Sequence, residues 1–412
     1  MTTEQGGILM IKPSEITWDD VVRVGAGTLG GEYLRCFWWP VALADEVKDV
    51  PVPVKVLGEE LVLFRDLSGR LTLLGAYCSH RRASLEYGII QTDGIRCAYH
   101  GWCYDRRGNI VDRPAEPIKT APNILHPWYP VQELGGFVFA YLGKDKETPP
   151  PLPKYDVLVQ DGYRVVERGD AGAGKAYNCN WLQGVENTTD TTHLTYLHRI
   201  YEKCPAFKPV ESEYGVKLYI LEPRTKPNHV ALRKRCTVLP TINRKSRELR
   251  PKNSEERSVT LQQAIWIIPI DDTHCEEMRL TVYPEKPSER RYHGAYLDQA
   301  KERERKPYDR RYYGEIKGNV PLEDKAMVES QGSIVDRTLE HPGYGDRAIL
   351  LLRKMIRDGI AEVANGGTPK GVLHEDMALV DLDIGIEEYA VDKVPEGRTA
   401  LLAELRQQSE QI

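Results

Sequence analysis

The sequence predicts an α+β fold in two domains: an all-β domain over residues 1–150, then a domain with an antiparallel sheet and flanking helices over residues 151–412. Three observations predict it. Short apolar runs separated by turn residues fill the first part, a proline-rich stretch interrupts the chain near residue 150, and helix-like and strand-like runs then follow without regular alternation. A chain of 412 residues is long enough for two domains.

The first domain is predicted from the region Val52–Gly75, where the apolar runs VPVKVL, LVLFRD and LTLLG are separated by the turn-forming segments GEE and LSGR. These runs predict a compact antiparallel β region. The segment TPPPLP at residues 148–153 cannot continue a helix or a central strand, so it predicts a linker and the domain boundary.

The second domain is predicted from two helical segments, Trp181–His198 and Asp346–Ile360, and from β-type runs at His229–Pro240 and Ser258–Ile270. This order favours an antiparallel sheet over alternating βαβ units. A glycine pattern at residues 25–30, GAGTLG, has the spacing of a dinucleotide-binding loop, but no clear buried strand precedes it. It is interpreted as a glycine turn at the start of a helix.

Composition narrows the function classes. The formal net charge is −5, from 56 basic and 61 acidic residues, so neither nucleic acid nor an anionic membrane is an expected partner. No apolar run approaches the ~20 residues that cross a bilayer, and the first residues, MTTEQGG, lack the features of a signal peptide, so a cytoplasmic location is expected. The eight cysteines are scattered along the chain, which favours reduced thiols and metal ligation.

The densest chemical signal is a pair of short motifs, Cys78-Ser79-His80 and Cys97-Ala98-Tyr99-His100. Two thiols and two imidazoles can close a four-ligand site, and a structural zinc ion is the simplest alternative. Here, however, each motif supplies one Cys and one His. That mixture suits a [2Fe-2S] cluster in which thiolates hold one iron and imidazoles hold the other.

A second group of candidate ligands lies beyond the linker, at Asp190, His193 and His198. Asp190 and His193 are three residues apart, so they share a helix face. His193 and His198 are five apart, about 140° around a straight helix, so a break or bulge between them is predicted if both bind one ion. Two histidines and a carboxylate form the facial triad of non-heme iron oxygenases. Taken alone, ordinary histidines would be the favoured interpretation.

Together these motifs resemble the Rieske non-heme iron aromatic oxygenases, specifically the phthalate dioxygenase-like branch. Cys-x-His followed by Cys-x-x-His-Gly-Trp looks like a Rieske domain, and Asp-x-x-His-x4-His looks like the catalytic region. Residues 27–46 and 323–356 resemble the same branch. Ser79 and Arg82 depart from the family's first loop, where Pro and Gly are frequent, and Cys103 is interpreted as a loop or core thiol.

The resemblance implies roles for particular residues. The cluster would be held by Cys78, His80, Cys97 and His100, and the mononuclear iron by His193, His198 and Asp346. Asp324, Asp336 and Glu340 are alternatives for the carboxylate, and Asp376 is a weaker one. Asp190 would bridge His193 to His100 of a neighbouring subunit, which implies a ring of subunits, a homotrimer or stacked trimers.

The resemblance also implies a catalytic domain of the helix-grip type and the oxygenase component of a multicomponent system. A separate reductase, with or without a ferredoxin, would deliver electrons from NAD(P)H, and O2 would be used to oxidise a small aromatic acid or aryl ether. The favoured reaction is O-demethylation of a methoxylated, lignin-type aromatic acid. Cis-dihydroxylation and diaryl-ether cleavage of a phthalate- or phenoxybenzoate-like substrate are the alternatives.

The sequence leaves two other classes of protein as alternatives: a Rieske electron-transfer protein without catalytic iron, and a zinc-stabilised binding module. The basic run from Arg233 to Arg250 is interpreted first as a solvated surface. Docking of an acidic ferredoxin and binding of a substrate carboxylate are its second interpretations.

Overall fold

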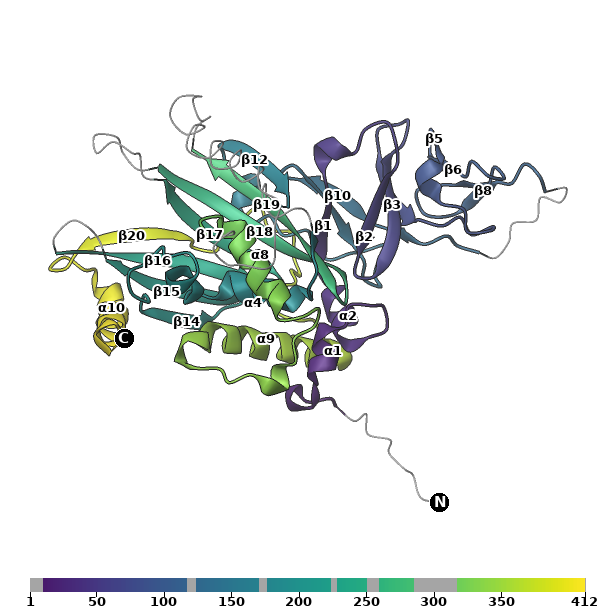
Figure 1. The fold of residues 1–412 in the computed structure, drawn as a ribbon. Coiled ribbons are helices and arrows are strands. Elements are labelled where there is room, and N and C mark those ends of the chain that lie inside the picture. The colour runs from purple at the N-terminus through teal and green to yellow at the C-terminus, as the bar shows by residue number, and fades with distance from the viewer. Residues whose placement is uncertain are drawn as a thin grey trace, which may run out of the picture.

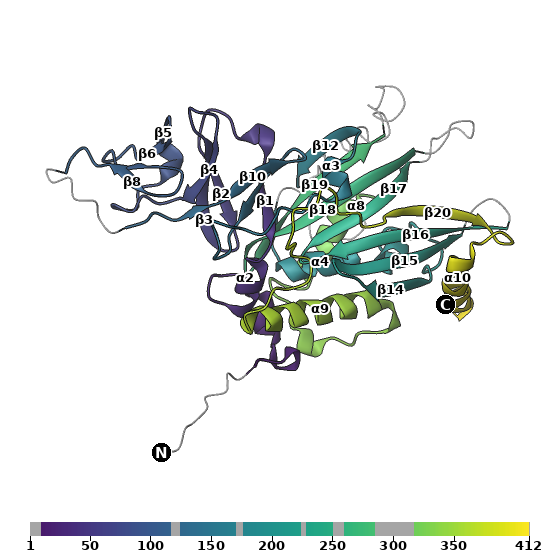
Figure 2. The same ribbon diagram turned by 180° about the vertical axis from the view of Figure 1, so that it is seen from behind.

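The protein is described by a computed structural model that covers residues 10–116, 124–169, 176–223, 228–249, 259–284 and 317–411. A β-rich projection extends from a larger body built on one wide sheet (Figure 1). The strands β5, β6 and β8 lie at the far end of that projection, and the view from behind shows the same arrangement (Figure 2). No helix in the described ranges is both long and apolar enough to span a bilayer.

The projection contains three small antiparallel sheets, as the short apolar runs predict. The runs around Val52–Gly75 form three neighbouring strands, and the central one buries four consecutive residues, Leu61–Phe64, because both of its faces are covered. The first sheet has the order β1 (Trp38–Leu43), β11 (Phe137–Tyr141) and β10 (Val131–Leu134). The second has the order β2 (Val52–Val56), β3 (Glu59–Arg65), β4 (Leu71–Gly75) and β9 (Trp128–Tyr129). The third has the order β5 (Ile89–Gln91), β6 (Gly94–Arg96), β7 (Cys103–Tyr104) and β8 (Ile110–Asp112).

The body contains a nine-stranded sheet in which each recorded pairing is antiparallel, so the predicted α+β class is confirmed. Its main order is β12 (Tyr163–Arg168), β19 (His274–Tyr283), β18 (Val259–Asp271), β17 (Ile242–Leu249), β16 (His229–Val238), β15 (Gly215–Pro223) and β14 (Phe207–Glu211). Two further strands pair at the side of this path, β13 (Ala176–Tyr177) with β19 and β20 (Gly385–Ala390) with β16.

Helices pack against this sheet and position the second group of candidate ligands. The described helices are α1 (Trp18–Val22), α2 (Leu29–Leu34), α3 (Asp156–Val159), α4 (Trp181–Thr189), α5 (His193–Tyr196), α8 (Val320–Ser330), α9 (Arg347–Ala364) and α10 (Glu396–Gln411). Helix α4 contacts β17, β18 and β19 on one side and α8 and α9 on the other. It therefore lies between the sheet and the outer helices.

The N-terminal helices pack against α9 of the body. Helix α2 contacts α9, and at Gly359 a Cβ atom would come within 2.6 Å of the Tyr33 ring, so glycine permits the close approach. The glycine pattern at residues 25–30 opens α2, with Thr28 as the N-cap, as its interpretation as a helix start expects. The proline-rich segment joins β11 to α3, and a boundary at residue 150 stays a prediction.

Candidate metal centres

Two loops at the end of the projection carry the four predicted cluster ligands, and they share one backbone pattern. The carbonyl of Cys78 accepts a hydrogen bond from the amide of Arg82, and the carbonyl of Cys97 accepts one from the amide of Gly101. Each cysteine amide in turn donates to the carbonyl five residues ahead, at Ala83 and Trp102 respectively. The two loops therefore fold locally in the same way and each aims a Cys and a His from the same positions.

The side chains of these loops form one group. Cys78 and Cys97 are buried, at 1% and 3% exposure, and the rings of His80 and His100 lie 4.7 Å apart. His80 stacks on Trp102, and its Nδ1 atom is buried with no hydrogen-bond partner in the described part of the chain. Two buried thiols and an imidazole nitrogen left without a partner fit the donor set of a [2Fe-2S] cluster bound by two Cys and two His.

Residues behind the cluster loops fix their orientation. The hydroxyl of Tyr104 lies 3.0 Å from the Cys78 sulfur and accepts a hydrogen bond from the Ser79 amide. His126, to which the sequence assigns no role, is fully buried, with one ring nitrogen 2.8 Å from the Ser79 hydroxyl and the other 2.9 Å from the Gly75 carbonyl. The sequence pattern does not reveal either contact, because His126 lies 47 residues from Ser79 and 51 residues from Gly75 along the chain.

Cys103 stands apart from this set. It lies in β7, is 4% exposed, and burial raises the pKa of its thiol. A neutral, buried thiol on a paired strand suits a core position, as its interpretation as a core thiol expects.

The second centre begins where α4 ends. Asp190 is the C-cap of α4 in an extended conformation, so the chain leaves the helix there and restarts in α5 at His193. The carboxylate of Asp190 accepts hydrogen bonds from the amides of Thr192 and His193 and lies 2.9 Å from Nδ1 of His193. Helix α5 ends at Tyr196, before His198, so the predicted break between the two histidines is confirmed.

Three side chains converge at this break. Ligand atoms of His193, His198 and Asp324 all lie within 4.8 Å of one another. The carboxylate of Asp324 is 2.9 Å from Nε2 of His198 and 3.7 Å from Nε2 of His193. Two imidazole nitrogens and one carboxylate oxygen facing a common point form the donor set of a mononuclear iron site with open positions.

Each histidine is oriented by a second carboxylate. Nδ1 of His193 contacts Asp190, and Nδ1 of His198 contacts Glu323 at 2.7 Å. These contacts leave the Nε2 atom of each ring to face Asp324. A carboxylate on the outer nitrogen fixes the tautomer and the plane of a metal-binding imidazole, so the pairs Asp190–His193 and Glu323–His198 fit a metal site.

The titration of these groups follows from the same contacts. Burial acts to raise the pKa of Asp190 and of Asp324, but hydrogen bonds and charge from the histidines outweigh it, so each pKa lies below its usual value. Burial acts to lower the pKa of His198, and its contacts with Asp324 and Glu323 raise the pKa overall. Both carboxylates are therefore ionised at neutral pH, as cation binding requires.

The structure brings Asp324, rather than the predicted Asp346, to the histidines, so Asp324 becomes the candidate for the carboxylate ligand. Asp346 ends a short 3-10 helix, Tyr344–Asp346, and its carboxylate accepts a hydrogen bond from the Gly343 amide. The helix that presents Asp324, α8, falls outside the predicted helical segments. Its proline near the start and the adjacent acids Glu323 and Asp324 are the signals that could have indicated it.

The remaining carboxylate candidates have other partners. Asp336 accepts from Thr338, Glu340 pairs with Arg353, and Asp376 pairs with Lys154. None of the three joins the group of His193, His198 and Asp324. Asp324, an alternative on chemistry alone, is the one that geometry selects.

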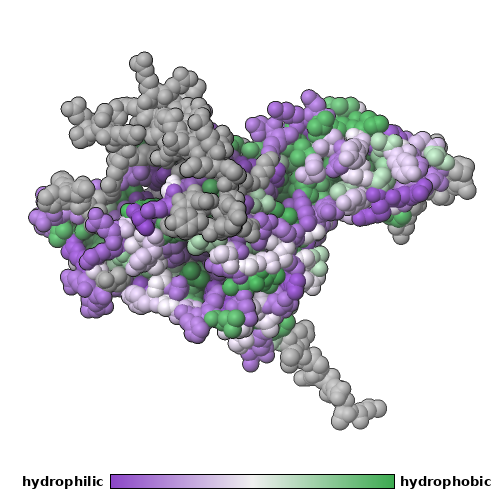
Figure 3. Space-filling view, in the orientation of Figure 1, coloured by the Kyte–Doolittle hydropathy of each residue, from purple (hydrophilic) through white to green (hydrophobic). Residues whose placement is uncertain are grey.

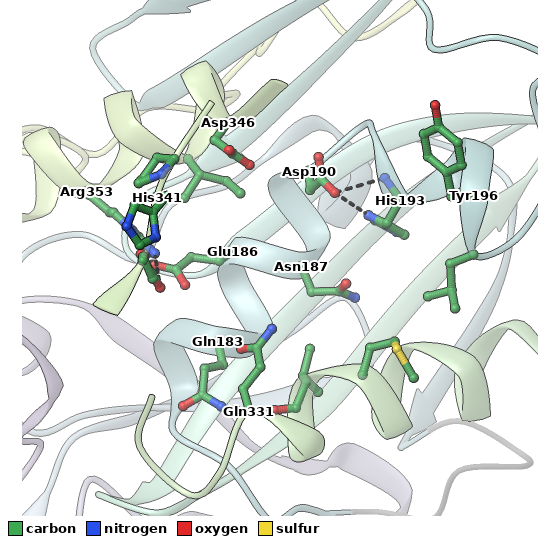
Figure 4. A pocket seen from close by; sticks show the side chains of 16 residues that line it. Gln183, Glu186, Asn187, Asp190, His193, Tyr196, Gln331, His341, Asp346 and Arg353 are labelled. Atoms are coloured by element: carbon green, nitrogen blue, oxygen red, sulfur yellow. Dashed lines mark hydrogen bonds and ion pairs between the residues drawn. The ribbon is translucent and has the colours of Figure 1, made fainter. Parts of the chain in front are cut away.

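A cavity of about 670 Å³ opens beside this centre on the side of α4 away from the sheet. Asp190 and His193 lie along one part of its wall, and Glu186, His341, Asp346 and Arg353 lie along another (Figure 4). Beneath it, the carboxylate of Glu186 is held by two buried guanidiniums, those of Arg337 and Arg353. The sequence gives no sign of this network, which ties α4 to α9.

The fold and the two centres define a chain in which a [2Fe-2S] domain is joined to a mononuclear iron domain. Comparison with known proteins agrees. The model of the Rieske [2Fe-2S] domain matches residues 37–122. Among solved structures, NdmB of Pseudomonas putida CBB5 shares the fold, with a TM-score of 0.63 and 20% identity over 83% of this chain and 96% of that one.

Three curated relatives are similar over most of the chain. They are the tert-butanol monooxygenase / tert-amyl alcohol desaturase oxygenase subunit of Aquincola tertiaricarbonis (30% identical; 83% of this chain, 76% of the relative), the phenoxybenzoate dioxygenase subunit alpha of Ectopseudomonas oleovorans (33%; 88% and 89%), and the 5,5'-dehydrodivanillate O-demethylase oxygenase subunit of Sphingobium sp. strain NBRC 103272 / SYK-6 (28%; 93% and 88%).

The chain therefore belongs to the Rieske non-heme iron oxygenases and is an oxygenase component. Its cofactors are a Rieske [2Fe-2S] cluster and a mononuclear non-heme iron, supplied with electrons from NAD(P)H through a reductase. A zinc-stabilised binding module and an electron-transfer protein without catalytic iron are both set aside, because the curated relatives are oxygenase subunits.

Proposed function

We propose that this chain oxidises an aromatic acid or aryl ether, with O-demethylation of a methoxylated aromatic acid as its reaction. The observation that carries the proposal is the convergence of His193, His198 and Asp324 beside Asp190 in a chain that also bears the cluster loops. The similarity to a dehydrodivanillate O-demethylase subunit supports demethylation, and the similarity to a phenoxybenzoate dioxygenase subunit supports an aromatic acid. A tert-butanol monooxygenase subunit of similar identity shows how widely substrates vary among the relatives.

The residues around the second centre have distinct tasks in this proposal. His193, His198 and Asp324 hold the iron, which when bound supplies the activation of O2. Glu323 keeps His198 oriented from the side opposite Asp324. Asp190 fixes the plane and the tautomer of His193, so the two imidazoles present their Nε2 atoms to the same point.

We also propose that electrons pass between neighbouring copies of the chain, from His100 of one to Asp190 of the next. Within one chain the strands β5, β6 and β8, which are close to the cluster loops in the sequence, lie at the far end of the projection, well away from α4 (Figures 1 and 2). A head-to-tail contact that places each projection on the next body closes into a ring, for which a trimer is the simplest form.

The surfaces that this contact would join are complementary. The exposed ring of Tyr99 contacts His100 on the projection, and Arg81 lies beside both. The cavity beside His193 is lined by the carboxylates of Asp190 and Asp346, and by Glu186 and Glu340, which are paired with Arg353. Both hydrophobic and hydrophilic residues are exposed on the visible face of the projection (Figure 3), a mixture that suits a contact with another protein.

The test is aerobic turnover by the holoenzyme with NADH and a matched reductase, over a panel of methoxybenzoates, phthalates and phenoxybenzoates. Demethylation predicts one formaldehyde released for each O2 consumed on a methoxybenzoate. A cis-diol from a phthalate, or a phenol from a phenoxybenzoate, would instead identify dihydroxylation or ether cleavage. The proposed substrate class is contradicted if protein that contains iron and a reducible cluster consumes no O2 with any member of the panel.

A further inference from the structure

The basic run from Arg233 to Arg250 is divided by the pleat of the sheet. Within β16 and β17, Lys234 and Arg244 point to the face away from α4 and are neutralised there, by Asp383 with Glu387 and by Asp156 respectively. On the α4 face, Arg233 is bound to Glu222 through two nitrogens. These three cations serve the fold.

Two cations on the α4 face have no carboxylate partner in the described part of the chain. One is Arg235, 6% exposed, whose guanidinium lies 3.5 and 3.4 Å from the carbonyls of Thr189 and Asp190. This contact caps the end of α4, and it leaves Nε of Arg235 buried with no hydrogen-bond partner among the described residues. The other is Lys245, half-buried on the neighbouring strand β17, for which the described residues offer no ion pair.

The surroundings of Lys245 are positive. Its charged neighbours are Arg279, Arg235, Glu277 and Arg247, and Glu277 is already engaged by the guanidinium of Arg279 at 2.9 Å. Burial, then repulsion from Arg279 and Arg235, lowers the pKa of Lys245 to about 7. Burial and the neighbouring cations disfavour the charged form of Lys245. Such a lysine fits a site that binds an anionic ligand, because the anion would offset this repulsion.

Lys245 lies on the sheet face that carries the end of α4. Two residues earlier on the same strand, the amide group of Asn243 donates to the carbonyl of Thr188 at 2.8 Å, in the last turn of α4. Two residues of strand span roughly 7 Å. Asn243 is fully buried and its Oδ1 atom has no partner in the described ranges. The side chains of Lys245 and Asn243 therefore share the sheet face on which the chain segment to His193 rests.

Polar groups continue this row across the sheet. Lys245 pairs in register with Gln263 of β18, and Gln263 pairs with Thr281 of β19. Gln263 donates a hydrogen bond to the Thr281 hydroxyl at 3.1 Å, which leaves the hydrogen of that hydroxyl free to donate. Gln263 therefore lies between Lys245 and Thr281 on this face, and the ammonium group of Lys245 is the charged donor of the row, suited to a carboxylate.

We propose that Lys245 binds the carboxylate of the substrate and so selects anionic aromatic substrates. The inference rests on the proposed function and names the group of this chain that recognises the acid. Lys245 is a specificity residue rather than a catalytic one. It holds the anion on the sheet face and leaves the remainder of the substrate to extend toward His193.

Direct binding tests this inference separately from turnover. Calorimetry with the oxidised holoenzyme and three probes, phthalate, 3-methoxybenzoate and 3-phenoxybenzoate, should show at least one acid that binds, and its methyl ester should bind at least tenfold more weakly. Lys245→Met should weaken binding of that acid by about tenfold to a hundredfold, the effect of losing a hydrogen bond to a charged group, and should leave the ester unchanged. Lys245→Arg should recover most of the affinity.

A charge-matched control is Lys208→Gln, since Lys208 lies on β14 and pairs with Glu404 at the surface. It should bind every probe as the wild type does. Acid affinity should also fall as the pH rises through about 7, because Lys245 loses its proton there, and Lys245→Met should abolish that dependence. The inference is overturned if no acid binds, if acid and ester bind alike, or if Lys245→Met binds the acid normally. Absence of turnover with normal acid binding would instead contradict the proposed function.

Discussion

The two metal centres of this chain are assembled in different ways. The cluster loops lie within residues 78–100, and each is closed by hydrogen bonds of its own backbone. The candidate iron centre joins residues 193–198 to residue 324. His193 is oriented by Asp190, three residues before it, but His198 depends on Glu323 from a distant segment for its orientation. The cluster site is therefore built by local folding, and the iron site by the docking of α8 against α5.

This difference predicts different sensitivities. Substitutions that disturb the packing of α8 should empty the iron site and leave the cluster intact. Substitutions in the cluster loops should change the properties of the cluster without changing the iron content. The following predictions test that separation, beginning with the largest expected effect.

Asp324→Asn should abolish turnover and remove most of the iron from the mononuclear site, because it replaces the one anionic ligand of the centre. The matched variant Asp346→Asn should retain its iron, since Asp346 accepts from the Gly343 amide instead. Metal analysis together with the spectrum of the reduced cluster measures both outcomes. Retained iron in Asp324→Asn and loss in Asp346→Asn would restore Asp346 as the ligand.

Glu323→Gln should weaken iron binding by about 10- to 100-fold, the usual effect of removing the carboxylate that orients a metal-bound imidazole. Glu323 contacts Nδ1 of His198, whose side chain is inaccessible to solvent, so water cannot easily replace the lost acceptor. Titration of the apo-protein with ferrous iron under anaerobic conditions gives the affinity. An unchanged affinity would show that His198 is oriented without Glu323.

Tyr104→Phe should lower the reduction potential of the cluster by roughly 20–60 mV, since it removes one hydrogen bond beside the Cys78 sulfur and such bonds favour the reduced form. The iron content and its affinity should not change. Redox titration followed by the spectrum of the reduced cluster measures the shift. A potential equal to that of the wild type would mean that the hydroxyl serves only the Ser79 amide.

Gly101→Ala should destabilise the cluster domain by about 1–2 kcal/mol. Gly101 has a φ of +77°, and a Cβ atom there would lie 2.6 Å from the Pro114 ring. Arg82, at the equivalent place in the first loop, already adopts a φ of +60°. Arg82→Ala is therefore the control, with little expected change. The temperature at which the visible absorption of the cluster is lost compares the two variants.

The sequence predicts the local centre more completely than the distributed one. Cys78, His80, Cys97 and His100 are close in the chain, so their spacing shows the pattern directly. His193 and His198 are also visible as a pair. The third ligand depends on which distant helix docks beside them, and neither spacing nor periodicity encodes the choice between Asp324 and Asp346.

The same limit applies to supporting residues. Glu323, His126 and Lys245 acquire their importance from neighbours far along the chain, or from the face of a strand on which they lie. The basic run shows this. Its composition suggests a solvated surface, but the pleat divides it into cations that stabilise the fold and two, Arg235 and Lys245, that lack a carboxylate partner in the described ranges.

The proposed passage of electrons between copies is tested most directly by hybrid oligomers. Chains with Cys97→Ser lack a functional cluster, and chains with His198→Ala lack the iron, so neither alone should turn over. Co-expressed and purified as mixed oligomers, they should regain activity, since an intact cluster on one copy then lies beside an intact iron site on the next. Mixed oligomers that stay inactive beside an active wild-type control would contradict the account.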